Sequence, residues 1–262
     1  MRKLSLGLVG VGGIGSTVLT EAAEGRLRGR VEPVAACDRN RERLEWVREL
    51  FPECETTTEL EEALEWDCDV IVEAASVEAA AELLPEALER ADVVILSVGA
   101  LVLEDGLLEE CLEVAERTGH RLFVPSGAVG GLDVLRAVSG AVEEVVLTTI
   151  KPPESLGRDA EEREVVFEGS VREAVKRFPR NVNVAAAISL AVGDPSRVRV
   201  RVVCDPEVDR NTHIIEVRSE VGDYRFELRN AALPENPKTS ALAAYSTVAL
   251  LERLTEGLRV GT

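Results

Sequence analysis

The chain carries a glycine-rich turn near its N-terminus, with the spacing Gly10-x-Gly12-x-x-Gly15. An apolar run, residues 4–9, precedes the turn, and a helical pattern, residues 16–23, follows it. Glycines at this spacing permit a tight turn and a close approach of the backbone to a ligand, and the N–H groups at a helix start attract phosphate. The turn, Gly10-Val11-Gly12-Gly13-Ile14-Gly15, is therefore predicted to bind the pyrophosphate of a dinucleotide.

An acidic residue stands where the second strand of such a unit should end. Asp38 lies 23 residues beyond Gly15, where a carboxylate can accept hydrogen bonds from the ribose hydroxyls next to adenine. Its charge disfavours the 2′-phosphate of NADP, whereas Arg39 and Arg41 beside it could attract one. The two arginines are equally well explained as solvated charges at a helix start. We therefore predict NAD as the cofactor, with NADP as the alternative.

Small residues follow two further strand candidates in the first half of the chain. These are Glu73-Ala74-Ala75-Ser76 and Ser97-Val98-Gly99-Ala100. Small side chains at such strand ends let a flat cofactor lie across them, so Ala75 and Ser76 are predicted cofactor contacts. Glu73 could face the nicotinamide ribose or cap the following helix, and both alternatives remain open at this point.

The chain has two histidines, so each can be weighed by its surroundings. His120 lies in a predicted helix-to-strand turn, where an imidazole commonly covers helix-end carbonyls. His213 enters a predicted strand of the second half. An imidazole can donate or accept a proton near neutral pH, so His213 is a candidate catalytic residue, the alternative being a half-exposed strand residue.

Two polar clusters of the second half also require an explanation. Asn181 and Asn183 begin an otherwise apolar helical segment, where one can cap the helix and leave Asn183 to meet a ligand. The segment 236–240 precedes the last predicted helix. Its Lys238, Thr239 and Ser240, together with the amides of a helix start, would suit a carboxylate. The alternative for this segment is an ordinary capped helix with a proline near its start.

The elements that must position these residues follow one pattern up to Pro125. Short runs rich in Val, Ile and Leu alternate with amphipathic, glutamate-rich segments, which is typical of a doubly wound parallel sheet in an α/β fold. The expected strands are 4–9, 31–37, 70–73, 93–97 and 121–124. The expected helices are 16–23, 41–50, 59–65, 78–89 and 104–118.

The pattern changes after Pro125, where a glycine-dense segment, 126–133, leads into alternating strands that suit a sheet with one solvated face. The expected strands are 142–150, 165–168, 198–204, 213–219 and 224–229, with helices at 134–138, 170–177, 182–190 and 240–254 and a loop at 154–162. Short turns between strands indicate antiparallel pairing. We therefore predict a Rossmann domain, 1–125, and a smaller α+β catalytic and dimerisation domain of mostly antiparallel sheet, 126–239. The C-terminal helix, 240–256, is expected to pack back on the first domain.

Composition narrows the class of protein. With 48 acidic and 30 basic residues the formal net charge is −18, which repels phosphate backbones and argues against nucleic acid as a partner. The sequence contains no apolar stretch of the roughly 20 residues that a membrane span needs, and its apolar start is too short for a signal peptide. Five scattered cysteines lack metal-ligand spacing and indicate buried thiols in a reducing compartment. We expect a cytoplasmic protein with a small-molecule substrate, adapted to heat or to salt.

Six motifs together resemble the L-aspartate dehydrogenases over essentially the whole chain. They are the glycine turn, residues 72–76, 125–133, 178–186, 211–213 and 236–240. Homoserine dehydrogenase and dihydrodipicolinate reductase share the first motif but not this ordered set. The resemblance implies NAD(P)-dependent oxidation of L-aspartate to iminoaspartate, which hydrolyses to oxaloacetate and ammonia or feeds NAD biosynthesis through quinolinate. It also implies a homodimer.

By position, the resemblance implies that His213 is catalytic and that Ala128 and Asn183 contact the cofactor. The substrate amine must be neutral before the neighbouring Cα can release a hydride, and a base such as His213 can take the amine's proton. The two substrate carboxylates need cationic or N–H partners, for which Lys238, Thr239 and Ser240 are the candidates. The alternatives are a dehydrogenase or reductase of another small carboxylate, such as a semialdehyde, and a non-catalytic NAD(H) sensor.

Overall fold

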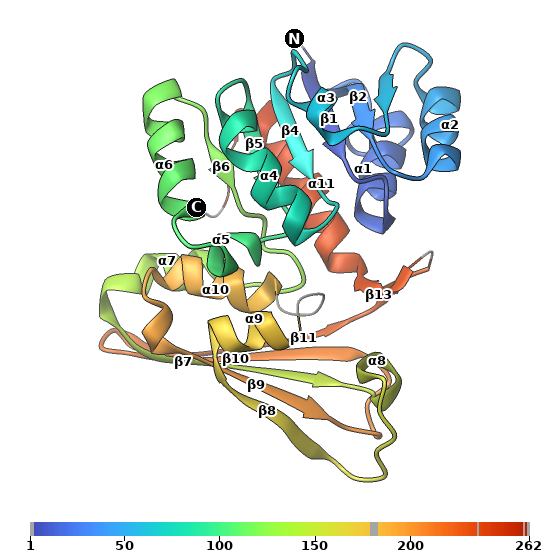
Figure 1. The fold of residues 1–262 in the computed structure, drawn as a ribbon. Helices are drawn as coiled ribbons and strands as arrows, with labels where there is room; N and C mark the ends of the chain where they lie inside the picture. The colour runs from blue at the N-terminus through green and yellow to red at the C-terminus, as the bar shows by residue number, and fades with distance from the viewer. Residues whose placement is uncertain (1–2, 179–182, 235, 259, 261–262) are drawn as a thin grey trace. The chain divides into compact units, whose positions relative to one another are not determined.

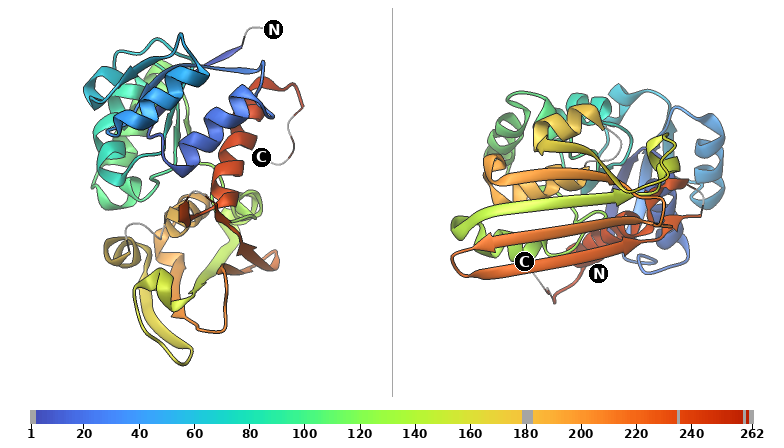
Figure 2. Two further views of the ribbon diagram at one scale, coloured as in Figure 1. Left: turned by 90° about the vertical axis from the view of Figure 1, so that its right-hand side faces the viewer. Right: turned by 90° about the horizontal axis from the view of Figure 1, so that it is seen from below.

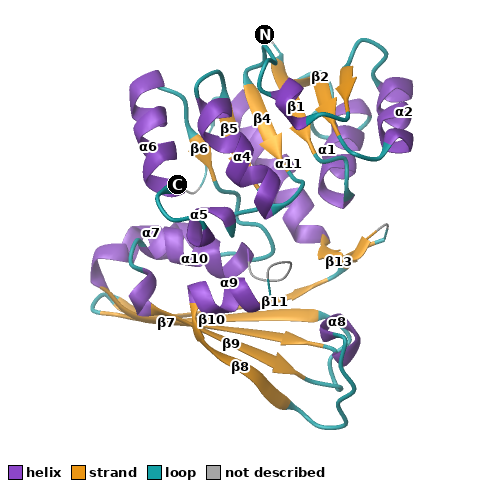
Figure 3. Cartoon of the chain, viewed as in Figure 1, coloured by secondary structure: helices purple, strands orange, loops and turns teal. Residues whose placement is uncertain are grey.

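The computed structural model of the chain describes residues 3–178, 183–234, 236–258 and 260 (Figure 1, Figure 3). The chain divides into two compact units. The first unit consists of residues 1–125 and 244–260, and the second unit consists mainly of residues 126–243.

The first unit contains a six-stranded parallel sheet in the order β3-β2-β1-β4-β5-β6. Its strands are β1 (Leu4–Val9), β2 (Val31–Cys37), β3 (Glu55–Thr57), β4 (Val70–Glu73), β5 (Asp92–Ile95) and β6 (Leu122–Phe123). This is the strand order of a dinucleotide-binding doubly wound sheet. The predicted α/β fold class is confirmed.

Helices surround this sheet (Figure 1). They are α1 (Gly13–Ala23), α2 (Arg41–Leu50), α3 (Leu60–Ala63), α4 (Val77–Leu88), α5 (Ala100–Leu103), α6 (Leu107–Thr118) and α11 (Ala241–Thr255). Leu6 and Leu8 of β1 are fully buried and belong to a core that also takes Val18 from α1 and Val248 and Leu251 from α11. The last helix of the chain therefore fills part of the core that the first strand begins.

The second unit contains a five-stranded sheet in the order β11-β10-β7-β9-β8. Its strands are β7 (Val142–Lys151), β8 (Glu164–Ser170), β9 (Val198–Cys204), β10 (Asn211–Ser219) and β11 (Gly222–Asn230). The β7–β9 pair is parallel and the other three pairs are antiparallel, so the mostly antiparallel sheet is confirmed.

One face of this sheet is covered by α7 (Leu132–Val138), α9 (Val171–Arg177) and α10 (Asn183–Val192) (Figure 1). The right-hand view of Figure 2 looks onto the other face, which carries no helix among the described residues. Burial alternates accordingly, with half-buried and exposed residues in turn along most of β11. A short helix, α8 (Pro153–Leu156), and a two-stranded ribbon of β12 (Ala232–Leu233) and β13 (Asn236–Ser240) complete the unit.

Several predicted elements are wrong in type or extent. The segment 236–240, expected only to precede the last helix, is the strand β13, and the helix begins at Ala241 instead of Ser240. The helix expected over 104–118 begins only at Leu107 (α6), because Gly106 before it takes a left-handed conformation (φ 85°), and the short helix α5, which ends at Leu103, was not predicted. The segment expected as a loop, 154–162, begins with the short helix α8, for which Pro153 supplies a suitable first residue. The edge strand β3 was not predicted because three residues are too few for a periodic signal.

Candidate functional site

The glycine turn lies between β1 and α1, and its three glycines meet different surroundings. Gly10 is left-handed (φ 95°), and a Cβ there would lie 2.6 Å from the carbonyl atoms of Ala74. A Cβ on Gly15 would overlap the carbonyl oxygen of Gly10. At Gly12, by contrast, the nearest heavy atom is Arg43 Nη1, 3.9 Å away. Gly10 and Gly15 are thus required by packing, whereas the missing side chain of Gly12 leaves open space.

That open space adjoins the start of α1. Gly12 is the N-cap residue, so no side chain caps the first turn, and the first turn contains no acidic residue. A helix start of this kind presents N–H groups and the positive end of the helix dipole, which suits a phosphate. The residues present therefore fit a dinucleotide pyrophosphate, and Gly13 and Ile14, the first two residues of α1, would supply N–H groups to it.

Asp38 follows β2 and connects the glycine turn to α2. Its Oδ2 accepts a hydrogen bond from the Val11 N–H (2.7 Å), and its Oδ1 accepts one from the Asn40 N–H (2.8 Å). The side chain is 10% exposed, so part of the carboxylate is available to a ligand. The arginine that pairs with it is Arg43, at 3.4 Å, which the sequence analysis did not single out. Arg39 and Arg41 are exposed.

Glu73 ends β4 and is fully buried. Its Oε1 accepts hydrogen bonds from the N–H groups of Ala75 (2.9 Å) and Ser76 (3.1 Å), and its Oε2 accepts one from the Ser97 N–H (2.9 Å). The Ser97 hydroxyl donates to Oε1 (2.8 Å). Burial raises the pKa of Glu73, against the lowering effect of these hydrogen bonds. Of the two open alternatives the geometry favours the structural one, because Glu73 holds the start of α4 and the end of β5.

Ala75 and Ser76, the predicted cofactor contacts on this strand end, are held in place by Glu73. Ser76 is the N-cap of α4 and accepts a hydrogen bond from the Ala79 N–H (3.2 Å). Ala75 is exposed. Because β1, β2 and β4 are parallel, the glycine turn, Asp38 and Ala75 follow the same edge of the sheet. The first unit therefore places the glycine turn, Asp38 and Ala75 with its neighbour Ser76 at one edge of its sheet.

His213 lies on β10 in the second unit and is 4% exposed. Its Nδ1 is 3.0 Å from the Thr149 hydroxyl on β7, directly opposite in the sheet register. Burial, together with the positive charge of Lys151, lowers the pKa of His213 to about 4. The imidazole is therefore neutral at pH 7, and one of its ring nitrogens is free of a proton. The half-exposed strand residue considered as the alternative is excluded by this burial.

Lys151, which the sequence analysis missed, is the last residue of β7 and is 5% exposed. Lys151 lies two residues beyond Thr149, so both side chains lie on the helix-covered face of the sheet. Cys204 of β9 flanks Lys151 on one side, and the β7–β10 register, continued by one residue, sets Asn211 on the other. Burial lowers the pKa of Lys151 to about 8. The alternation Val145, Leu147, Thr149, Lys151 was the available signal, but the predicted strand stopped at Ile150.

Ala128 lies in the glycine-dense segment before α7. Its carbonyl oxygen accepts a hydrogen bond from Asn230 Nδ2 (2.8 Å), and Asn230 pairs with Asn211, two residues before His213. Gly131 is left-handed (φ 82°), and a Cβ there would lie 2.7 Å from the Phe226 ring. This segment is therefore packed on β11, the neighbour of the strand that carries His213.

The remaining predicted residues are distributed over the second unit. Asn183 is the first residue of α10 and is half-buried, while Asn181 lies outside the described residues. Thr239 and Ser240 lie in β13 and are half-buried. The side chain of Lys238 lies outside the described part of the chain. In the first unit, His120 occupies the predicted turn, and its Nδ1 lies 2.8 Å from the Leu88 carbonyl oxygen.

Among the described residues, no three His, Cys, Asp or Glu side chains gather closely enough to hold a metal ion. Within the same part of the chain, no helix combines the length and apolar character of a membrane span.

Comparisons with known proteins agree with this arrangement. A model of the homoserine dehydrogenase NAD-binding domain matches residues 10–125, and a model of the aspartate dehydrogenase C-terminal domain matches residues 133–254. The L-aspartate dehydrogenase of Methanopyrus kandleri is 68% identical over the full length of both chains, and that of Methanothermobacter thermautotrophicus is 41% identical, again over the full length of both.

Among solved structures, aspartate dehydrogenase from Thermotoga maritima superposes with a TM-score of 0.81 at 34% identity, covering 99% of this chain and 100% of that chain. The match to full-length relatives includes both the glycine turn with Asp38 and the strand that carries His213. The chain therefore belongs to the L-aspartate dehydrogenase family.

Proposed function

We propose that the protein catalyses the NAD-dependent oxidation of L-aspartate to iminoaspartate. The observation that carries the proposal is His213, a buried, neutral imidazole held by Thr149 in the part of the chain that matches the aspartate dehydrogenase model. The glycine turn and Asp38 supply the matching cofactor site in the other part.

The residues of the second unit would handle the proton. In the tautomer that the proposal requires, His213 donates its Nδ1–H to the Thr149 hydroxyl 3.0 Å away, which leaves Nε2 as the acceptor. Nε2 takes a proton from the α-ammonium group of aspartate, so that the amine lone pair can form the C=N bond as the Cα–H bond breaks. NAD, which the glycine turn and Asp38 would hold, would supply the acceptor for the Cα hydride. The products are iminoaspartate in its protonated (iminium) form, NADH and a proton on His213, so charge and electrons balance. Loss of the iminium proton to water then gives the neutral imine.

The fate of the product follows from its chemistry. Water adds to the C=N bond of iminoaspartate and releases oxaloacetate and ammonia unless a second enzyme uses the imine first, as in NAD biosynthesis through quinolinate. We place the enzyme in the cytoplasm, where NAD and aspartate are available and the five buried cysteines remain reduced. NADP is the weaker cofactor in this proposal, because Asp38 repels a 2′-phosphate.

The test is direct. Purified protein mixed with L-aspartate and NAD should produce NADH, followed by its absorbance. His213→Gln should lower kcat by about 10²–10⁴-fold while NADH binding is retained, because only the proton acceptor is lost. His120→Gln, which changes the other histidine, is the matched control and should be fully active.

Two results would contradict the proposal. A wild-type protein that binds NADH but oxidises no aspartate would favour the sensor alternative. Faster turnover of another small carboxylate, such as a semialdehyde, would favour the alternative substrate class.

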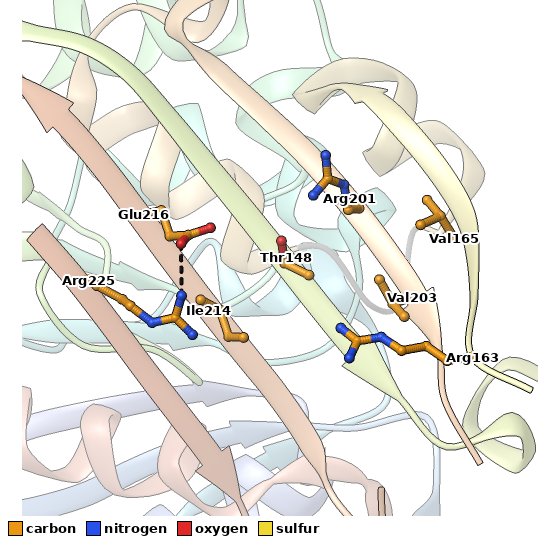
Figure 4. A pocket seen from close by; sticks show the side chains of 8 residues that line it. All are labelled: Thr148, Arg163, Val165, Arg201, Val203, Ile214, Glu216 and Arg225. Carbon is orange, nitrogen blue, oxygen red and sulfur yellow. Dashed lines mark hydrogen bonds and ion pairs between the residues drawn. The ribbon is translucent and has the colours of Figure 1, made fainter. Parts of the chain in front are cut away.

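The family resemblance also implied a homodimer, and the uncovered sheet face of the second unit is the surface we propose for it. Figure 4 shows a hollow on this face, which is lined by Thr148, Arg163, Val165, Arg201, Val203, Ile214, Glu216 and Arg225. Its apolar side chains include Val165, which is 57% exposed. Arg225 pairs with Glu216 (2.8 Å), and Arg201 with Glu168 (3.1 Å). A face that carries both signs of charge around an apolar centre can pair with a second copy of itself.

Light scattering after size-exclusion chromatography tests the dimer. The wild type should have twice the mass of the chain, and Val165→Asp should reduce it to the monomer mass. Leu112→Asp is the control, because Leu112 is similarly exposed (54%) but lies on α6 of the first unit. A dimer that survives Val165→Asp but not Leu112→Asp would place the interface elsewhere.

A further inference from the structure

The mechanism above leaves unused a buried cation in the second unit. We propose that Lys151 is the subsite for one carboxylate of the dicarboxylic substrate, and that the bound carboxylate, by offsetting this positive charge, allows His213 to accept a proton. The inference rests on the proposed function, because it takes aspartate as the substrate.

The position of Lys151 in the sheet carries the first part of the argument. Lys151 and Thr149 lie two residues apart on one face of β7, and His213 lies opposite Thr149 on β10. His213 and Lys151 are therefore diagonal neighbours, a relation in which residues lie roughly 7–8 Å apart. A molecule the size of aspartate can span such a pair, with its amine at the imidazole and a carboxylate at the ammonium group.

A second polar atom at this place points to a ligand. The side-chain oxygen of Asn211 is buried and has no hydrogen-bond partner among the described residues. The register, continued by one residue beyond Thr212–Ile150, sets Asn211 opposite Lys151, and Asn211 lies two residues before His213 on the same face of β10. An unused carbonyl oxygen is an acceptor for the N–H groups of the substrate amine, whereas a lysine is a donor to its carboxylate. The pair can therefore fix both ends of an amino acid.

Electrostatics link the two roles. Lys151 is the charged group that opposes protonation of His213. The charged side chains on the covering helices are solvated to a greater extent than Lys151. On α7 and α9 the exposed ones are Asp133, Arg136, Glu173, Lys176 and Arg177, and Arg172 is half-buried. Helix α10 has no charged residue. Asp205, next to Cys204, faces Arg163 at 3.6 Å. A carboxylate that arrives at Lys151 in this poorly solvated place would offset the charge that keeps His213 neutral.

Binding of succinate, the dicarboxylate that lacks the amine, tests the subsite without turnover. The NADH-loaded enzyme should bind succinate, and Lys151→Met should weaken its Kd about tenfold or more, with NADH affinity unchanged. Lys176→Met, at an exposed lysine of α9 in the same unit, is the matched control and should bind like the wild type. An unchanged Kd in a folded Lys151→Met protein overturns the inference.

A second measurement does not depend on the variant folding. Because the pKa of Lys151 is about 8, succinate binding to the wild type should weaken as the pH rises through 8 and the ammonium group loses its proton. Affinity that stays constant from pH 7 to about 9.5 overturns the inference, since a carboxylate held by an ordinary lysine or arginine would not lose its partner in this range.

The coupling to His213 has its own readout. With ¹⁵N-labelled histidine the protein gives signals from two imidazoles, and His120 serves as the internal control. Saturating succinate should raise the titration midpoint of His213 by about one pH unit or more. Lys151→Met should raise it without succinate, and adding succinate should then change it little. A His213 titration midpoint that shifts neither with succinate nor in Lys151→Met overturns the coupling.

The outcomes separate this inference from the proposed function. If the wild type oxidises aspartate but Lys151→Met binds succinate normally, only the subsite is wrong. If the wild type oxidises no aspartate yet binds succinate through Lys151, the proposed reaction is wrong and the dicarboxylate subsite stands.

Discussion

At the scale of single residues, Asp38 and His213 of the two candidate sites lie in different surroundings. Asp38 stays partly exposed and accepts hydrogen bonds from the backbone N–H groups of Val11 and Asn40. His213 is buried next to a cation, which favours its neutral form. Acceptor oxygens suit recognition of a ribose diol, whereas a neutral imidazole suits acceptance of a proton.

Asp38→Asn should change cofactor preference. The variant keeps an oxygen for one of the two N–H groups but loses the charge that repels a 2′-phosphate, and Arg43 at 3.4 Å loses its partner. We expect the ratio of kcat/KM for NAD to that for NADP to fall about 10- to 100-fold, which corresponds to about 1.4–3 kcal/mol. Glu45→Gln, an exposed carboxyl on α2, is the control. An unchanged ratio in Asp38→Asn would show that this charge does not select the cofactor.

His213 should also make the stability of the protein depend on pH. The unfolded chain binds a proton on this residue below about pH 6.5, whereas the folded chain does so only below about 4. The free energy of unfolding should therefore fall as the pH falls from about 6.5 to 4, by about 3 kcal/mol in total from this residue. Urea unfolding at several pH values should show a shallower decline for His213→Gln than for the wild type. Equal declines in both proteins would contradict the assigned pKa.

At the scale of elements, different glycines of the turn between β1 and α1 serve packing and ligand binding. Gly12→Ala places a methyl group in open space at an ordinary backbone conformation (φ −76°), so the protein should fold with nearly unchanged stability. NADH affinity should nevertheless fall at least about tenfold, because the methyl group occupies the approach to the N–H groups of α1. Fluorescence titration with NADH measures the loss, and full affinity in this variant would place the pyrophosphate elsewhere.

Gly15→Ala is the matched comparison on the same turn. Its methyl group would overlap the carbonyl oxygen of Gly10, so this variant should lose several kcal/mol of stability or fail to fold. Thermal melting compares the two alanine variants directly. If both melt like the wild type, the close packing of α1 on β1 is not as tight as the distances indicate.

The carboxylate of Glu73 connects the start of α4 to the end of β5 through hydrogen bonds, and replacing one of its oxygens tests this connection. Glu73→Gln turns one oxygen into an NH₂ group that faces N–H donors, either that of Ser97 or those of Ala75 and Ser76. Unpaired buried donors should lower the free energy of unfolding by about 1–3 kcal/mol. Urea unfolding measures this, with Glu82→Gln on the exposed side of α4 as the control. No loss of stability would mean that Glu73 has another role, such as the ribose contact considered earlier.

The sequence predicted most strands and helices of both units because their apolar periods are regular and their ends carry glycine or proline. Prediction failed where the pairing partner decides the structure. Residues 236–240 look like a helix start, with Pro237 before a helical segment, yet they form a strand because β12 lies beside them.

The same distinction between local pattern and pairing partner explains which site residues could be predicted from the sequence. Asp38 was predicted from its spacing to the glycine turn, and His213 because it is one of two histidines and matches the catalytic position of the family that the chain resembles. Lys151 was missed because a lysine at a strand end usually faces solvent, and only the register with β9 and β10 places it on the covered face. Arg43 was missed because Arg39 and Arg41 lie nearer to Asp38 in sequence, whereas the pairing of Arg43 depends on the path of the chain into α2.

At the scale of the whole molecule, the net charge of −18 should oppose the compact state by self-repulsion. Raising KCl from about 0.05 to about 0.5 M shortens the Debye length, so Tm should rise by several degrees. Calorimetry checks this. A variant with Glu45, Glu49 and Glu116, all exposed, changed to Gln should show a smaller rise. A Tm that falls with salt would mean that the surface ion pairs outweigh the net repulsion.

The contribution of α11 to the core of the first unit has a consequence for synthesis. The strands β1 to β6 leave the ribosome early, but Val248 and Leu251, which complete their core, follow only after residues 126–243. At a ribosomal rate of roughly 5–20 residues per second this delay is on the order of ten seconds. During that time the nascent first unit exposes the apolar surface on which α11 will later pack, and a chaperone can bind there. The second unit can therefore finish folding before the domain that was begun first.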